Sequence, residues 1–227
     1  MLVRNWMSRN VVTVEADDSM AKAGRLMKEN KVSRLPVMKK GKLVGIVTNG
    51  DIRRASASDA TSLEIHELLY LLSKIKIGSI MTPDPITVPP DYTVEEVAQI
   101  LRERGISGVP VVETDGRLVG IITKNDLFNV IVSLTGFDKK GIQFAVRIED
   151  RPGSIKEVTD IIRSYGGRLA SILSSYEKVP EGYRNVFIRT YDVDRAKVDS
   201  LVNDLRAKIT LRYYVDHREN KRMIYDA

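Results

Sequence analysis

Two short segments of the sequence combine a glycine, a threonine and an aspartate where an apolar strand is expected to end. They read Gly-Ile-Val-Thr-Asn-Gly-Asp at residues 45–51 and Gly-Ile-Ile-Thr-Lys-Asn-Asp at residues 120–126. A threonine with an acid one helical turn later is a capping box, which stabilises a helix start by about 1 kcal/mol. The same helix start offers unpaired N–H groups to a phosphate, and the aspartate can accept the hydroxyls of a ribose. The residues leave both interpretations open.

These segments close two copies of one longer pattern, at residues 7–54 and 81–129. Both copies also contain Met-x-x-x-x-x-Thr-Val and Ser-x-x-Pro-Val. An internal repeat dictates the architecture, and two copies are too few for a solenoid. We therefore expect a pseudo-symmetric pair in which each copy covers the apolar face of the other.

Each copy is predicted to contain a strand, a helix, two strands and a helix. In the second copy these are a strand over 86–88, a helix between Thr93 and Gly105, strands over 109–112 and 118–122, and a closing helix after Thr123. Thr93 and Glu96 have capping-box spacing, and the apolar residues that follow recur at helical spacing. Residues 55–78, between the copies, carry leucines that predict an amphipathic helix buried against the pair or a second subunit.

From about residue 140 a different pattern begins. The predicted elements are a strand over 142–148, a helix from Ile155 ended by Gly166 and Gly167, strands over 168–177 and 184–191, a helix over 198–205 and a strand over 209–215. The order βαββαβ is the ferredoxin-like arrangement, an antiparallel sheet with both helices on one face. The expected fold class is therefore mixed α/β (α+β): a pseudo-two-fold pair followed by a ferredoxin-like domain.

Composition excludes several classes of site. The 227 residues include no cysteine and only His66 and His217, so disulfides, thiolate metal sites and histidine catalysis are not expected. No apolar run is long enough for a membrane span, and a cytoplasmic protein without membrane or metal is expected. The net charge is +6, but the basic residues are scattered, so we do not expect nucleic-acid binding.

The repeated motifs resemble those of a tandem cystathionine-β-synthase (CBS) domain pair, also called a Bateman module. The resemblance implies an adenine nucleotide or related adenosyl ligand between the repeats. Thr48 and Thr123 would meet phosphate, Asp51 and Asp126 would hold ribose hydroxyls, and Arg34 would be a further phosphate contact. The remaining nucleotide-binding residues would surround the base: Thr13, Ser33, Pro36, Thr87, Ser107, Gly108 and Pro110. Gly108 replaces Arg34 in the second copy, so the two sites are expected to differ.

The C-terminal part resembles an ACT domain, a module that often binds amino acids. The candidate amino-acid site is the first loop of that family: Asp150, Arg151, Pro152, Gly153, Ser154 and Ile155. The alternative is a helix-start turn in a domain that only dimerises. Taken whole, the chain resembles bacterial AcuB-type proteins, which are associated with acetoin utilisation. The expected domains are repeat 1 (1–54), a helical insert (55–78), repeat 2 (79–137), the ACT domain (140–217) and a polar tail (218–227).

The expected function is regulatory and not enzymatic. An adenine nucleotide (AMP, ADP or ATP) or related adenosyl ligand would bind the CBS pair as a regulatory ligand, with no catalytic cofactor. The ACT domain would serve dimerisation or amino-acid sensing, and a homodimer is expected by resemblance. Two alternatives stay open: a regulatory subunit that acts on a separate enzyme, and a nucleic-acid-binding protein. CBS pairs also occur inside IMP dehydrogenases, but this chain has neither a barrel-sized segment nor a cysteine nucleophile.

Overall fold

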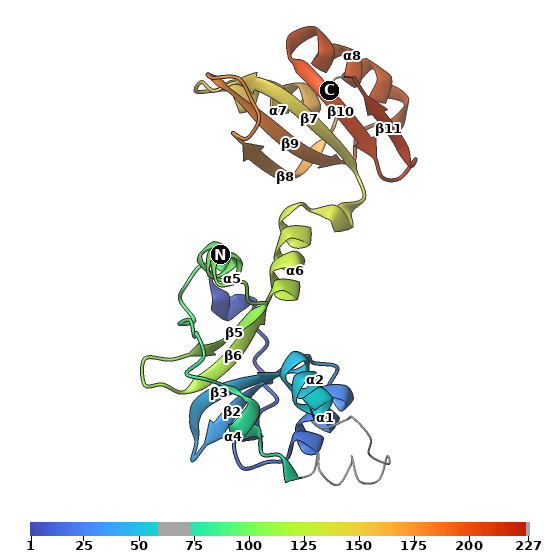
Figure 1. Ribbon diagram of the computed structural model, residues 1–227. Helices are drawn as coiled ribbons and strands as arrows, with labels where there is room; N and C mark the ends of the chain where they lie inside the picture. The colour runs from blue at the N-terminus through green and yellow to red at the C-terminus, as the bar shows by residue number, and fades with distance from the viewer. Residues whose placement is uncertain (59–73, 226–227) are drawn as a thin grey trace. The chain divides into compact units, whose positions relative to one another are not determined.

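The computed structural model describes residues 1–58 and 74–225 of the chain. These residues form two compact units, Met1–Phe128 and Asn129–Ala227 (Figure 1). The helix predicted within residues 55–78 falls largely on 59–73, which lie outside the described residues. In the part of the chain that the structure describes, no helix is long and apolar enough to cross a membrane.

The first unit contains both repeats in the predicted order as far as Phe128, which lies within the last helix of the second repeat. The first repeat comprises β1 (Val14–Glu15), α1 (Met20–Glu29), β2 (Arg34–Lys39), β3 (Lys42–Thr48) and α2 (Asn49–Ser58). The second comprises α4 (Ile77–Ile80), β4 (Thr82–Pro83), α5 (Val94–Glu103), β5 (Gly108–Val112), β6 (Leu118–Thr123) and α6 (Lys124–Leu134). The strand predicted over 86–88 is reduced to a single bridge between Val88 and Val111. The prediction of a mixed α/β fold with a pseudo-symmetric pair is confirmed.

The first helix of each repeat begins directly after a residue whose side chain caps it. The Thr93 hydroxyl accepts a hydrogen bond from the N–H of Glu96 (3.3 Å), whose carboxylate accepts from the N–H of Thr93 (2.7 Å). This is the predicted capping box, and it satisfies two N–H groups that the first turn would leave unpaired. In the first repeat Ser19 caps α1 through the N–H of Lys22. Gly105 follows α5 with φ +64°, a conformation that glycine adopts without strain.

The two repeats exchange their first segments. Ser8, at the start of the first repeat, pairs with Ile121 of β6 in the second repeat. In turn Thr82 of β4, at the start of the second repeat, pairs with Ile46 of β3 in the first. Each repeat therefore completes its sheet with chain that belongs, by sequence, to the other.

Two methionines of the exchanged segments pack against glycines of the other repeat. A Cβ at Gly120 would lie 2.3 Å from the Sδ of Met7, and a Cβ at Gly45 would lie 2.4 Å from the Sδ of Met81. Each glycine therefore leaves the room that a methionine of the other repeat fills. Ile77 follows the same principle, because it precedes β4 yet is fully buried in the core of the first repeat.

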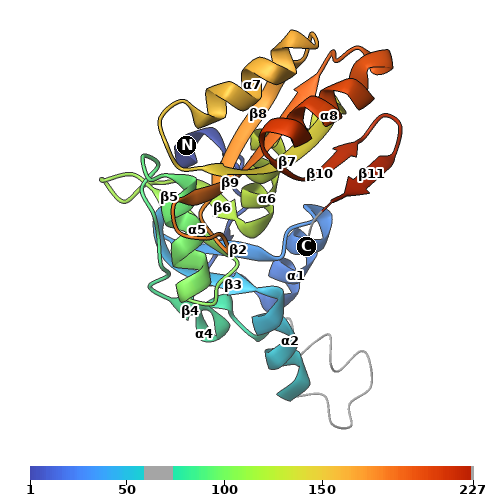
Figure 2. The same cartoon turned by 90° about the horizontal axis from the view of Figure 1, so that it is seen from above.

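The second unit is an antiparallel sheet with two helices on one face (Figure 2). Its elements are β7 (Ile142–Glu149), α7 (Ser154–Ser164), β8 (Arg168–Ser175), β9 (Tyr183–Tyr191), α8 (Val198–Lys208), β10 (Thr210–Asp216) and β11 (Lys221–Ile224), with short 3-10 turns at Phe137–Lys139 and Arg195–Lys197. A further 3-10 turn, Val3–Asn5, belongs to the first unit. The strand order is β11-β10-β7-β9-β8. Without β11 this is the predicted ferredoxin-like order. Alternate residues of β7, including Phe144 and Val146, form the core with α7 and α8.

The segment expected as a polar tail contains a strand. Residues Lys221–Ile224 of β11 pair with β10 at the edge of the sheet. The carboxylate of Asp216 accepts hydrogen bonds from the N–H groups of Arg218 (2.9 Å) and Glu219 (3.2 Å), which fixes the turn between the strands. The charged residues of this turn conceal the strand signal, since they carry no apolar alternation.

The packing of the exchanged segments predicts how a substitution at Gly120 changes the stability of the protein. Gly120→Ala should lower the free energy of unfolding by about 1–3 kcal/mol, because the new methyl group overlaps Met7. The matched control is Gly24→Ala in the interior of α1, where nothing lies within 4 Å of the added Cβ. This control should raise the free energy of unfolding by up to about 1 kcal/mol, because alanine favours a helix over glycine. Urea denaturation measures both changes. Equal effects at the two sites would contradict the close packing of Met7.

Candidate functional site

Both threonine–aspartate turns form reciprocal hydrogen bonds at the start of a helix. The Oδ2 of Asp126 accepts from the backbone N–H and from the hydroxyl of Thr123, each at 2.7 Å. The Oδ2 of Asp51 accepts from the same groups of Thr48, at 2.8 and 2.6 Å. The helix-cap interpretation of the motif is therefore confirmed. It also commits each threonine hydroxyl proton to a carboxylate.

The two turns differ in the second carboxylate oxygen. The Oδ1 of Asp51 is held by the guanidinium of Arg54 in a short ion pair, and the side chain of Asp51 is 8% exposed. Among residues 1–58 and 74–225, the Oδ1 of Asp126 has no hydrogen-bond partner. Asn129 occupies the position that corresponds to Arg54. Of the two aspartates, Asp126 is therefore the one whose second carboxylate oxygen has no partner among the described residues.

One cleft of the first unit, here the Asp126 cleft, has a volume of about 540 Å³. Its walls come from the start of the first repeat, from the segment around β2, and from the junction of β6 and α6. Six predicted nucleotide-binding residues line it: Ser33, Arg34, Pro36, Ser107, Thr123 and Asp126. Residues of both repeats therefore build this cleft, as the predicted pseudo-symmetric pair requires.

A second cleft, here the Thr48 cleft, has a volume of about 340 Å³ and corresponds to the first by the internal repeat. Its walls come from the start of the second repeat, from the segment around β5, and from the end of β3. Five predicted residues line it: Arg34, Thr48, Ser107, Gly108 and Pro110. Asp51 is not on its wall, consistent with the burial of that carboxylate against Arg54.

Thr13 and Thr87, predicted beside the base, do not line either cleft. The wall of the Asp126 cleft includes Val11 and Val12 instead, and the wall of the Thr48 cleft includes residues 85 and 86. These two pairs occupy corresponding positions in the repeats. The repeat itself is therefore the sequence signal that relates them, although no local motif marks them as wall residues.

The charges in the two clefts are unequal. Among the described residues, the charged side chains that line the Asp126 cleft are Lys31, Arg34, Lys124 and Asp126. Those that line the Thr48 cleft are Arg34 and Asp84. The Asp126 cleft therefore carries a surplus of positive charge that suits an anionic group, whereas the Thr48 cleft is balanced. Sequence reasoning missed both lysines, because isolated lysines between apolar residues look like ordinary surface residues.

Arg34 lies between the clefts. Its Nη2 donates a hydrogen bond of 2.6 Å to the hydroxyl of Ser107, in the other repeat. Burial lowers the pKa of the Arg34 guanidinium from its ordinary value, and the nearby charge of Asp126 opposes that change. An arginine stays protonated at neutral pH even so, and this one is a fixed positive charge.

The Asp126 cleft can hold a nucleoside with an anionic substituent. Val11, Val12 and Val32 supply apolar surface for a flat ring. The Oδ1 of Asp126 can accept from a ribose hydroxyl, and the first turn of α6 leaves N–H groups that favour an anion. In the described part of the chain, no group of three or more His, Cys, Asp or Glu side chains is placed to hold a metal ion.

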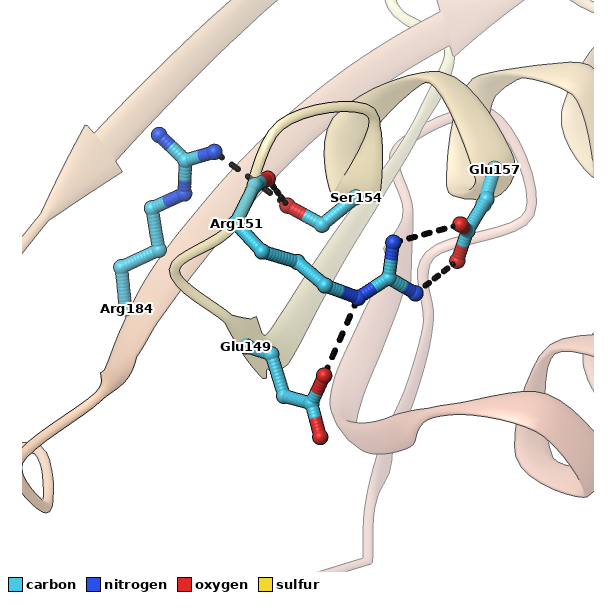
Figure 3. A network of polar contacts seen from close by, with 5 residues as sticks. All are labelled: Glu149, Arg151, Ser154, Glu157 and Arg184. Carbon is cyan, nitrogen blue, oxygen red and sulfur yellow. Dashed lines mark hydrogen bonds and ion pairs between the residues drawn. The ribbon is translucent and has the colours of Figure 1, made fainter.

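The predicted amino-acid loop of the second unit is held by its own polar contacts (Figure 3). The guanidinium of Arg151 donates two hydrogen bonds of 2.8 Å to Glu157 and one of 3.0 Å to Glu149. The Ser154 hydroxyl donates to the carbonyl of Arg151 (2.9 Å) and accepts from Arg184 (3.2 Å). Hydrogen bonds to Glu157, and then to Glu149, raise the pKa of Arg151.

The rest of this loop combines an ion pair with open space. Asp150 lies 3.4 Å from the guanidinium of Arg184. Gly153 has φ +88°, and nothing lies within 4 Å of the position of a Cβ there. Pro152 and Gly153 thus leave backbone accessible, while Ser154 and Ile155 begin α7. A ligand at this loop would approach exposed backbone next to an already paired arginine.

Comparison with known proteins identifies the first unit. A model of the CBS domain family matches residues 3–58 and 77–133. A CBS domain-containing protein of Dictyostelium discoideum is 32% identical over 135 residues, which are 59% of this chain and 93% of that protein. An inosine-5′-monophosphate dehydrogenase of Korarchaeum cryptofilum is 37% identical over 124 residues, 55% of this chain but only 23% of the enzyme.

Solved structures show the same fold. The CBS domain pair of protein MJ0100, in complex with 5′-methylthioadenosine and S-adenosyl-L-methionine, is 32% identical with a TM-score of 0.50, covering 58% of this chain and 95% of that one. An acetoin utilization protein (AcuB) of Vibrio cholerae is 24% identical with a TM-score of 0.51, covering 62% and 97%. At this identity the likeness to AcuB shows the fold alone. The chain belongs to the family of proteins that carry a tandem pair of CBS domains.

Proposed function

We propose that this chain is a regulatory protein, without catalytic activity of its own, that binds an adenine nucleotide or related adenosyl ligand in its CBS pair. The observation that carries the proposal is the Oδ1 of Asp126, an acceptor without a hydrogen-bond partner among the described residues, in a cleft with surplus positive charge. The related CBS pair of protein MJ0100 binds 5′-methylthioadenosine and S-adenosyl-L-methionine, which share the adenosine group.

In the proposed complex the ribose hydroxyls donate to the Oδ1 of Asp126. The adenine ring lies against Val11, Val12 and Val32, and the phosphate of AMP, ADP or ATP lies near Lys124 and the first turn of α6. Hydrogen bonds from the two ribose hydroxyls to the carboxylate of Asp126 would select a ligand that contains a ribose. The apolar wall would accept any flat base. The Thr48 cleft is the second site, and it is weaker because Arg54 occupies the remaining oxygen of Asp51.

For the second unit we propose an ACT-like role in association or in sensing an amino acid at residues 150–155. Regulation requires that the ligand bind two conformations of the chain with different affinity, and the resulting change of conformation would alter how the chain acts on a separate enzyme.

We propose that the chain functions as a homodimer. Exposed apolar side chains of α6 at helical spacing, Phe128, Ile131 and Val132, support association through that helix.

A thermal-shift screen tests the proposed ligand class. The full chain is heated with AMP, ADP, ATP, NAD, S-adenosylmethionine or each of the common amino acids. At a hundredfold excess over the dissociation constant, a ligand of the native state stabilises it by about 2.7 kcal/mol and raises the melting temperature. We expect a shift with an adenosine ligand. Absence of any shift across the adenosine series would contradict the proposed function, and a shift with an amino acid would support sensing at the second unit.

A pair of substitutions tests the ribose contact. Asp126→Ala should weaken the binding of the adenosine ligand by about 10- to 100-fold, because hydrogen bonds to a charged group contribute about 1.5–3 kcal/mol. Asp51→Ala is the matched control, since it removes the same helix cap from the other repeat. It should lower the melting temperature while reducing affinity much less. Isothermal titration calorimetry gives both affinities, and unchanged affinity in both variants would contradict the site.

A further inference from the structure

Arg34 breaks the symmetry of the pair. It is the first residue of β2, where it lies opposite Thr48 of β3. The corresponding residue of the second repeat is Gly108, which lies opposite Thr123 of β6. At this pair of related positions the protein therefore has one guanidinium rather than two.

The missing side chain at Gly108 makes room for that guanidinium. A Cβ at Gly108 would lie 2.4 Å from the Nη1 of Arg34 and 2.9 Å from the Cγ2 of Thr123. The Nη2 of Arg34 is anchored on Ser107, the residue directly before this glycine. The arginine of the first repeat thus fills space that a side chain of the second repeat would take, and it lines both clefts.

The clefts depend on Arg34 to different degrees. In the Thr48 cleft Arg34 is the one cationic side chain among the lining residues that the structure describes. In the Asp126 cleft Lys31 and Lys124 accompany it. A phosphate in either cleft gains from Arg34, because an arginine–phosphate pair is charge-assisted and bidentate. The guanidinium of Arg34 is one rigid plane with five N–H donors, one of which Ser107 already uses, so turning it toward a phosphate in one cleft turns it away from a phosphate in the other.

We propose that Arg34 couples the two clefts, so that a phosphorylated adenosine ligand in one cleft weakens the binding of a second phosphorylated ligand in the other. The inference rests on the proposed function and concerns the regulation of that same site. Coupling between two sites is reciprocal, so it acts whichever cleft fills first. An adenosine ligand without a phosphate, such as 5′-methylthioadenosine, does not compete for the guanidinium. The pair therefore favours mixed occupancy, with one phosphorylated and one uncharged ligand.

Isothermal titration calorimetry of the full chain tests the coupling. AMP and 5′-methylthioadenosine are each titrated, and the ratio of the second to the first dissociation constant is compared between them. The ratio with 5′-methylthioadenosine reports the difference between the clefts for an uncharged ligand. The unequal charges of the clefts add to the ratio for AMP, so the Arg34 and Gly108 variants complete the comparison. With AMP the ratio should be at least about tenfold larger, because the second phosphate lacks its charge-assisted contact. One AMP site alongside two sites for 5′-methylthioadenosine is the extreme form of the same result.

Arg34→Gln separates the shared guanidinium from simple repulsion between two phosphates. If Arg34 is shared, its loss weakens the binding of the first AMP by about tenfold or more and changes the affinity for the second AMP little. The ratio of the second to the first dissociation constant therefore decreases. If repulsion between the two phosphates alone makes the second AMP bind more weakly, loss of the cation leaves this ratio unchanged or increases it. Gly108→Ala should narrow the ratio as well, since the new methyl group displaces the guanidinium without removing its charge. The charge-matched control is Arg25→Gln on the exposed face of α1, which should leave both ratios unchanged.

The outcomes are distinct. A ratio for AMP that narrows in Arg34→Gln, with 5′-methylthioadenosine binding retained, supports the coupling. Equal ratios for the two ligands in the unsubstituted protein, or an AMP ratio unchanged or widened in Arg34→Gln, overturn it and leave the proposed function standing. A single site for both ligands overturns it in the same way. No binding of either ligand overturns the proposed function, and the coupling with it.

Discussion

The structure of the first unit depends on the exchange of the first segments of the two repeats. Met7 packs where Gly120 has no side chain, and Met81 packs where Gly45 has none. Because each sheet is completed by chain from the other repeat, neither repeat can form its final edge alone. The walls of both clefts come from both repeats for the same reason. In the proposed complex, a ligand in either cleft therefore contacts both repeats, and its affinity depends on how the repeats pack.

Within this symmetric frame, the departures from symmetry distinguish the sites. The threonine–aspartate turn caps a helix in both copies, so the cap alone does not identify a ligand site. Arg54 closes the remaining oxygen of Asp51, whereas Asn129 leaves that of Asp126 open. A cap uses one carboxylate oxygen and a ribose needs another, so a single residue can serve both purposes. In the proposed complex, the residue three positions after the aspartate, Arg54 or Asn129, decides whether it does.

Local signals in the sequence predicted the elements well, because capping boxes, glycines and apolar periodicity act over a few residues. The helix after Thr93 and the turn at Gly105 are of this kind. The strand β11 was not predicted, since its turn is fixed by Asp216 and its residues lack apolar alternation. The wall residues Val11 and Val12 were missed because their place depends on how the two repeats pack. Such contacts join residues far apart in the sequence, and no local pattern encodes them.

A crystal structure of the full chain with AMP tests the central claim most directly. The account predicts AMP in the Asp126 cleft, with a ribose hydroxyl oxygen within about 2.5–3.0 Å of the Oδ1 of Asp126. It also predicts that the Oδ2 keeps its two hydrogen bonds to Thr123, so that the cap survives when the ligand binds. A nucleotide bound elsewhere, or one in this cleft whose ribose does not contact Asp126, would contradict the account.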